Sequence, residues 1–358
     1  YGKTYYEDAT IRIDGAGIYP DMAETPMLIR GRGNSSWSNS SGSKNPYRIK
    51  FEEKVKPFGM TKGKSWVLLA NKQGNSMTTN AIAMKIADMV ESDGCNHCIP
   101  VELYVNNQYR GSYNFTEKVG LSNNSINLED DSRAVMLELD SYYDESYKFR
   151  DQNYNLYVNV KDPDLNEMTD ANERSLFFQQ VQNAFNNFTY TVRNNSYATK
   201  DPTTSPLDVQ SFVRAWLVTD LTRNTELQHP KSWYVYNEDV TNGHMPWHFG
   251  PVWDFDWSYG YEGHSTYFIS DAETDICNYG NVGTPFFRQL ARTSEVVKKE
   301  YYRLWTHFLA EGKLDELVDF CDDYFAFLEP SFKHNATMWG DGTGYAKTTE
   351  NAKKWLVK

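Results

Sequence analysis

The chain has few cysteines, and they do not make up a metal site. Among its 358 residues there are four. Cys95 and Cys98 have the spacing of a metal knuckle or a redox pair, but a zinc site needs a second pair of ligands, and no second Cys-x-x-Cys is present. We therefore expect either a local disulfide or two free thiols here.

Positive charge and long apolar runs are also scarce. The chain has 36 Lys and Arg against 48 Asp and Glu, a formal net charge of -12, so it has no broad basic face and nucleic acid is excluded as its main partner. No apolar run approaches the roughly 18–20 residues of a membrane span. No signal peptide is visible and the chain opens at Tyr1, so we expect a processed or excised piece of a longer chain.

What the sequence does contain is a strand-rich first half and a helix-rich second half. Apolar periodicity predicts strands at 9–14, 26–30, 46–52, 66–70, 101–105, 109–117 and 135–139, with a helix at 75–90. Later it predicts helices at 173–193, 208–223, 294–311 and 314–327, and a strand pair at 233–237 and 248–256. Composition shifts near 140–170. We expect an α+β fold in a single domain, with a strand-rich lobe over about 1–140, a helix-rich lobe over about 141–358, and a ligand in the cleft between them.

The most informative segment is 248–260, which carries Asp254 and Asp256. If 249–257 is extended, alternation places both carboxylates on one side. Two adjacent carboxylates repel each other unless a cation or a proton lies between them. Mg²⁺ binds carboxylate oxygens and keeps phosphates as further ligands. The segment therefore predicts a metal–phosphate site, and a solvated turn with two acids is an equal alternative.

Three further segments become informative through their order. A Gly-rich turn at 30–36 contains Arg30 and Arg32, Lys50 lies on the next strand, and a polar loop at 224–226 ends in Glu226. Each alone is typical of ordinary structure: a tight turn, an exposed lysine, a helix end. Together with the Asp-Phe-Asp segment they follow the order in which protein kinases place a Gly-rich cover, a lysine, a catalytic loop and a metal-binding acid. This order predicts phosphate transfer.

Several blocks resemble the spore-coat protein H (CotH) kinase family. They are Ile29-Arg-Gly-Arg-Gly-Asn-Ser-Ser-Trp37, Asn45-Pro-Tyr-Arg-Ile-Lys-Phe51, Lys64-Ser-Trp-Val-Leu-Leu-Ala-Asn71, the 101–106 and 109–118 segments, Met136-Leu-Glu-Leu-Asp140 and Gly250-Pro-Val-Trp-Asp-Phe-Asp256. The resemblance implies an atypical protein-kinase-like two-lobed fold that binds ATP with Mg²⁺ or Mn²⁺. Active members of the family transfer phosphate to Ser on secreted proteins. We accordingly expect a monomer that is extracellular or on the cell surface and acts on a secreted or surface protein.

The same resemblance assigns roles to individual residues. Asp254 would bind the metal, with Asp256 as a second ligand, and Trp253 would stack on the adenine. Glu226 falls where the family commonly has Asp and would act as metal ligand or base. Basic candidates for the phosphates are Arg30, Arg32, Lys50 and Lys64.

Three positions depart from the family pattern. Glu226 adds a methylene to the common Asp, which moves the carboxylate by about 1–1.5 Å and costs as much as about 10²-fold in rate. Thr79 and Lys85 stand where many members have Arg and Glu. A catalytically degenerate binding or adhesion module is therefore an alternative hypothesis. A lesser one is a carbohydrate-active protein that pairs Glu226 with Asp254 or Asp256 as acid and base.

Overall fold

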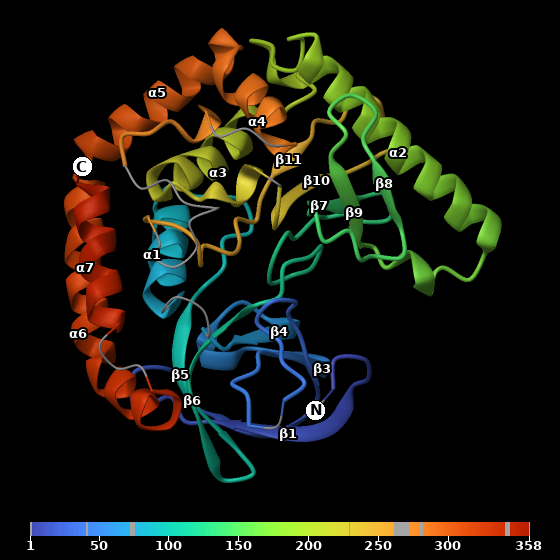
Figure 1. The fold of residues 1–358 in the computed structure, drawn as a ribbon. Helices are drawn as coiled ribbons and strands as arrows, with labels where there is room; N and C mark the ends of the chain where they lie inside the picture. Colours follow the sequence, from blue (N-terminus) through green and yellow to red (C-terminus); the bar gives the residue numbers. More distant parts are fainter. Residues whose placement is uncertain are drawn as a thin grey trace.

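The computed structural model describes residues 2–40, 42–71, 76–228, 230–260, 272–278, 282–340 and 344–357. These residues form two antiparallel sheets and seven α-helices (Figure 1). The fold is thus a mixture of α and β structure, as the sequence predicts. The prediction of one domain with a boundary near residue 140 stays a prediction.

The first sheet contains the six strands that come earliest in the chain. Its order is β1-β2-β3-β4-β6-β5. The strands are β1 (Glu7–Ile13), β2 (Met22–Gly31), β3 (Tyr47–Val55), β4 (Gly63–Leu69), β5 (Ile99–Val105) and β6 (Gln108–Glu117). Alternation buries Ile49 and Phe51 of β3, and Trp66 of β4 stacks on Phe115 with ring centroids 5.4 Å apart. This sheet therefore has a core of its own.

The second sheet has the order β11-β10-β7-β9-β8. Its strands are β7 (Val135–Leu139), β8 (Lys148–Arg150), β9 (Tyr157–Asp162), β10 (Trp233–Asn237) and β11 (His248–Phe249). Val135, Leu137 and Leu139 of β7 are completely buried and belong to a larger core that also contains residues from the helices. The two sheets thus contribute to different cores.

Most of the helices pack around the second core. They are α1 (Ser76–Met89), α2 (Ala171–Arg193), α3 (Val209–Thr222), α4 (Gly283–Arg292) and α5 (Glu295–Ala310). Asp208 begins α3 by accepting the Ser211 N–H, and Ser294 begins α5 in the same way, as N-cap residues do. Although α1 lies between β4 and β5 in the sequence, its buried Ile82 and Ile86 belong to the second core. This helix therefore links the two parts.

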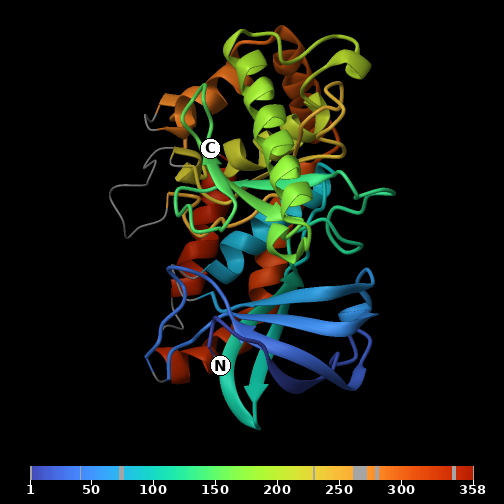
Figure 2. The same ribbon diagram turned by 90° about the vertical axis from the view of Figure 1, so that its right-hand side faces the viewer.

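Helix α6 (Lys313–Trp339) runs from the helical part of the molecule down to the first sheet, and α7 (Gly344–Leu356) returns toward the helical part and packs against α6, α1 and α3 (Figure 1 and Figure 2). At the sheet end of α6, Asn335 Oδ1 accepts the Ser112 N–H at 3.0 Å, and Trp339 Nε1 donates to the Arg110 carbonyl at 3.0 Å. At its other end, Lys313 Nζ donates to the Met89 carbonyl of α1 at 2.8 Å. The helix therefore joins the first sheet to α1.

Most predicted elements are confirmed to within a few residues, and one is wrong. The strand predicted at 248–256 ends at Phe249, because Gly250 turns to φ 137° and Pro251 has no N–H to continue the ladder. The helix predicted at 314–327 continues to Trp339. Among the described residues, no helix is long and apolar enough to cross a membrane.

Candidate functional site

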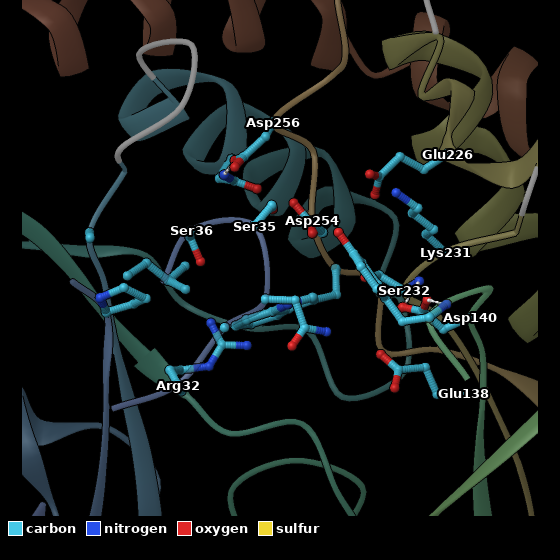
Figure 3. A pocket seen from close by; sticks show the side chains of 18 of the residues that line it. Arg32, Ser35, Ser36, Glu138, Asp140, Glu226, Lys231, Ser232, Asp254 and Asp256 are labelled. Atoms are coloured by element: carbon cyan, nitrogen blue, oxygen red, sulfur yellow. Dashed lines mark hydrogen bonds between the residues drawn. The ribbon is translucent and has the colours of Figure 1, made fainter. Parts of the chain in front are cut away.

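A cavity of about 410 Å³ lies where the two sheets approach each other. Its lining comes from the end of β2 and the turn after it, the end of β4, α1, β7, β9, the loop before β10 and the 253–257 segment. Ligand pockets typically measure about 300–1,000 Å³, so the cavity has the size of a small-molecule site. Charged side chains of both signs point into it (Figure 3).

The Gly-rich turn forms one wall of the cavity. A Cβ on Gly31 would lie 2.0 Å from the Trp37 ring, so only glycine fits there. The Arg32 N–H donates to the Pro46 carbonyl at 3.1 Å, which holds the turn against the start of β3. The Arg32 guanidinium lies 5.8 Å from the centroid of the Trp253 ring. Burial lowers the pKa of Arg32, while Tyr234 and Asp254 raise it. The acids across the cavity thus favour the protonated form of Arg32, against the effect of burial.

The acidic wall is an irregular loop held by asparagines. Asp254 has φ 63°, in the left-handed region that Asp and Asn tolerate better than most residues. Its carbonyl accepts a hydrogen bond from Asn224 Nδ2 at 3.0 Å. On α1, Asn80 accepts the Phe255 N–H at 2.8 Å and donates to Asp256 Oδ1 at 2.5 Å. The two carboxylates are thus placed by side chains, and the alternation predicted for an extended 249–257 segment is wrong.

Glu226 lies on the short helix η4 (Thr225–Gln228) and is buried. Its N–H donates to Asn224 Oδ1 at 3.2 Å, so Asn224 positions both Glu226 and Asp254. Within the described part of the chain, Glu226 Oε2 is buried without a hydrogen-bond partner. Burial raises the pKa of Glu226 well above its ordinary value, and the Asp254 carboxylate raises it further, whereas Lys231 lowers it. Such a carboxyl group requires a proton or a cation beside it.

The same acids are the donors that suit a divalent metal. The described residues contain no group of three or more His, Cys, Asp or Glu side chains that could hold a metal ion. Mg²⁺, however, is usually bound through one or two carboxylates together with phosphates and water. Asp254 and the unpaired Glu226 Oε2 fit that chemistry, while one oxygen of Asp256 is already bonded to Asn80. Burial raises the pKa of Asp254, against the lowering effect of Arg32 and Lys231, so a cation would also favour its ionised form.

A comparison with known protein families identifies the family of this chain. Residues 29–357 match the CotH kinase protein family. The chain belongs to the CotH kinase family. No curated protein matches it. Membership of this family suggests a kinase-like function and implies the use of ATP in general.

The cavity brings together most of the residues to which the CotH resemblance gives a role. Arg30, Arg32, Glu226, Trp253, Asp254 and Asp256 line it. Arg30 is turned toward the start of the chain, where its Nη1 donates to the Lys3 carbonyl at 2.9 Å. Lys50 and Lys64 are exposed and do not line the cavity. Alternation explains Lys50, because its neighbours Ile49 and Phe51 on β3 face the core.

Two of the three departures from the CotH pattern, Thr79 and Lys85, lie on α1. Thr79 is buried, and Lys85 Nζ pairs with Glu316 of α6 at 2.9 Å. Neither residue lines the cavity. At the end of the loop after α1, Cys95 and Cys98 are free thiols, and burial raises the pKa of Cys98 to about 12. These thiols are therefore poor nucleophiles and poor metal ligands.

Several residues that line the cavity have no role in the site predicted from the sequence, among them Glu138, Lys161, Lys231 and Tyr234. Glu138 Oε1 accepts the Tyr234 hydroxyl at 2.6 Å, and Lys161 Nζ lies 3.0 Å from Glu138 Oε2. The signal for Glu138 was its place in the 136–140 block that carried the resemblance. No pattern in the sequence points to Lys161 or Lys231, because both residues reach the cavity only through the tertiary fold.

Proposed function

We propose that the chain is an ATP- and divalent-metal-dependent phosphotransferase that acts on Ser of secreted or surface proteins, on a two-lobed kinase-like fold. One observation carries the proposal: the Gly-rich turn with Arg32 and the acidic residues Asp254 and Glu226 line the same cavity. Phosphoryl transfer needs both parts, because the protein contributes mainly positioning and charge stabilisation. The two separate cores with a cavity between the sheets support the two-lobed interpretation.

The residues then divide into two groups by charge. Arg32 and the backbone amides of the turn would hold the phosphates, since glycine lets the backbone approach closely. Asp254 and Glu226 would hold the cation, which neutralises phosphate charge when bound. Trp253 lines the cavity beside Arg32 and offers a ring for the adenine. Asp256, which accepts a hydrogen bond from Asn80, would be a further ligand through its other oxygen.

Phosphate transfer releases one proton from the acceptor hydroxyl, and a single side chain takes it up. The acceptor serine Oγ forms a bond to the γ-phosphorus of ATP while the bond to the β–γ bridging oxygen breaks. Glu226 takes the hydroxyl proton, and ADP leaves with the bridging oxygen. For this role the Glu226 carboxyl must be ionised, which burial opposes and a neighbouring cation favours.

The test compares the wild type with Asp254→Asn. Asparagine keeps the size of the side chain and tolerates the left-handed backbone, so only the charge is removed. We expect calorimetric ATP binding that needs Mg²⁺ or Mn²⁺ and is lost in Asp254→Asn, with labelled phosphate transferred to Ser-rich acceptors only by the wild type. Asp323→Asn, at an exposed position on α6, is the matched control and should behave as the wild type. Absence of ATP binding by the wild type contradicts the proposal.

A second candidate is a kinase-like module that binds ATP and has lost turnover. Lys85 favours it, because this departure from the family pattern is engaged by Glu316 and supplies nothing to the cavity. Binding of ATP without transfer by the wild type would support this candidate. Transfer gained by Glu226→Asp, which restores the common family residue, would then show that the longer side chain is the cause.

A further inference from the structure

The chain ahead of β1 is bound to the Gly-rich turn. The Gly31 N–H, at the end of β2, donates to the Gly2 carbonyl at 2.7 Å. Arg30 Nη1 donates to the Lys3 carbonyl at 2.9 Å. The Arg30 guanidinium also lies 4.9 Å from the centroid of the Tyr6 ring, within cation–π range. The backbone of Lys3 therefore has a fixed place beside the turn.

The Lys3 side chain lines the cavity together with the turn. Its Nζ donates to the Gly33 carbonyl at 2.5 Å and to Asn34 Oδ1 at 3.4 Å. An ammonium group has three N–H donors, so these two acceptors leave one donor for a ligand. Both acceptors are uncharged oxygens, which hold the ammonium in place without neutralising it.

Lys3 differs in this respect from two other basic residues that line the cavity. Lys161 Nζ lies 3.0 Å from Glu138 and 2.6 Å from Glu145, so its charge is already balanced by carboxylates. Arg30 directs one nitrogen to the Lys3 carbonyl and so supports the chain that carries Lys3. A phosphate group at the Gly-rich turn would meet the Lys3 ammonium as an unneutralised cation, the kind of donor that makes strong hydrogen bonds to phosphate.

We propose that Lys3 is a phosphate-binding residue of the nucleotide site, which donates its remaining N–H to the phosphate chain of ATP while it holds the Gly33 carbonyl. The inference deepens the proposed function and rests on it. Lys3 precedes residues 29–357, which match the CotH kinase family, so the family match gives it no role. The nucleotide site thus uses a part of the chain that lies ahead of the matched region.

Substitutions can separate the charge of Lys3 from its contacts. Lys3→Met keeps an apolar stem but removes the charge and the hydrogen bonds. Lys3→Arg keeps the charge. Lys62→Met, at an exposed position just before β4 and outside the cavity lining, is the matched control. Should the methionine variant fail to fold, Lys3→Gln gives the same comparison, because it keeps a neutral donor for the Gly33 carbonyl.

The experiment measures the affinities of ATP and of adenosine by calorimetry in the presence of Mg²⁺. Lys3→Met should weaken ATP binding by about 10- to 100-fold, the loss expected for one charge-assisted hydrogen bond. Adenosine carries no phosphate, so its affinity should stay within about twofold of the wild-type value. Lys3→Arg should lose less ATP affinity than Lys3→Met, and Lys62→Met should bind as the wild type. An equal loss for ATP and adenosine overturns the inference, because it would show that Lys3 only shapes the turn.

Tripolyphosphate, titrated in the same way, separates this inference from the proposed function. A wild type that binds tripolyphosphate but not ATP, with that binding weakened in Lys3→Met, contradicts the proposed function and leaves the phosphate site at Lys3 intact. A wild type that binds ATP and transfers phosphate, with unchanged ATP affinity in Lys3→Met, contradicts the role of Lys3 alone. A wild type that binds neither compound contradicts both.

Discussion

Asn80 on α1 holds the loop of Asp256 by two hydrogen bonds from one side chain. Its amide nitrogen donates to Asp256 Oδ1 at 2.5 Å, and its carbonyl oxygen accepts the Phe255 N–H at 2.8 Å. The loop also carries Asp254, so a residue from between β4 and β5 sets the geometry of the acidic wall. The helix and the loop are 176 residues apart along the chain.

Asn80→Ala should therefore lower the free energy of unfolding by about 1–3 kcal/mol, because it leaves a buried N–H and a carboxylate without this partner. ATP affinity should fall as well, since the loop loses its anchor. Urea unfolding and calorimetry check both effects. Asn187→Ala, at an exposed position within α2, is the control and should change neither. Equal stability of Asn80→Ala and the wild type contradicts the anchoring role.

Glu226→Gln should change how stability depends on pH. Because the folded-state pKa of Glu226 is raised, the folded protein binds more protons than the unfolded one above the ordinary value of 4.5. This contribution to the free energy of unfolding is present below that value and is lost as pH rises through the folded-state pKa. Without nucleotide, the glutamine variant should gain stability over the wild type as pH rises from about 4.5 to 8.

Urea unfolding across this pH range tests the expectation. Glu53→Gln, at an exposed position on β3, is the control and should keep the wild-type profile. Parallel profiles for Glu226→Gln and the wild type would contradict the raised folded-state pKa of Glu226.

The basic residues that the sequence proposes for phosphate binding should differ in how much their substitution weakens ATP binding. Arg32 lines the cavity, whereas Lys50 and Lys64 are exposed and lie outside its lining. Removing a charge-assisted hydrogen bond costs about 1.5–3 kcal/mol, and each 1.4 kcal/mol is tenfold in affinity. Arg32→Met should thus weaken ATP binding by roughly 10- to 100-fold. Lys50→Met and Lys64→Met should stay within about twofold, as measured by calorimetry, and a larger loss at either lysine contradicts this separation.

Gly111→Ala should destabilise the contact between β6 and α6. Gly111 has φ 104°, and a Cβ there would lie 2.6 Å from Asn335 Oδ1 and 2.7 Å from Trp339 Nε1. The variant combines backbone strain with a steric clash, each worth about 1–3 kcal/mol. A fall in thermal midpoint of several degrees is expected. Gly243→Ala has open space around its Cβ and should leave the midpoint nearly unchanged.

Local signals in the sequence predicted much of this architecture. Apolar periodicity predicted a strand at 46–52, and Ile49 and Phe51 of that segment are buried in β3. The helix predicted at 208–223 is observed as α3, which Asp208 caps. These features depend on residues that are close together in the sequence, so a local sequence pattern is enough to predict them. The acids of the candidate site could be named in the same way, because Asp254 and Glu226 lie in short segments with a known resemblance.

What escaped prediction depends on distant contacts. The left-handed backbone of Asp254 has no sequence signal of its own, because it follows from hydrogen bonds with Asn80 and Asn224 around it. The approach of Lys231 to Glu226 depends on a turn tied to the chain beyond β7. Alternation in β3 is enough to predict that Lys50 is exposed, but its place in the motif order suggested a role at the phosphates instead.

The contact between Asn335 and Ser112 has a consequence for biosynthesis. The two residues are 223 positions apart, although the first sheet is complete in sequence by Glu117. At translation rates of about 5–20 residues per second, the covering helix leaves the ribosome roughly 10–45 s after the strand it covers. During this interval the polar groups of β6 that α6 later satisfies face solvent or other chains. The nascent protein is thus exposed to mispairing at β6, and release of α6 from the ribosome ends the vulnerable period.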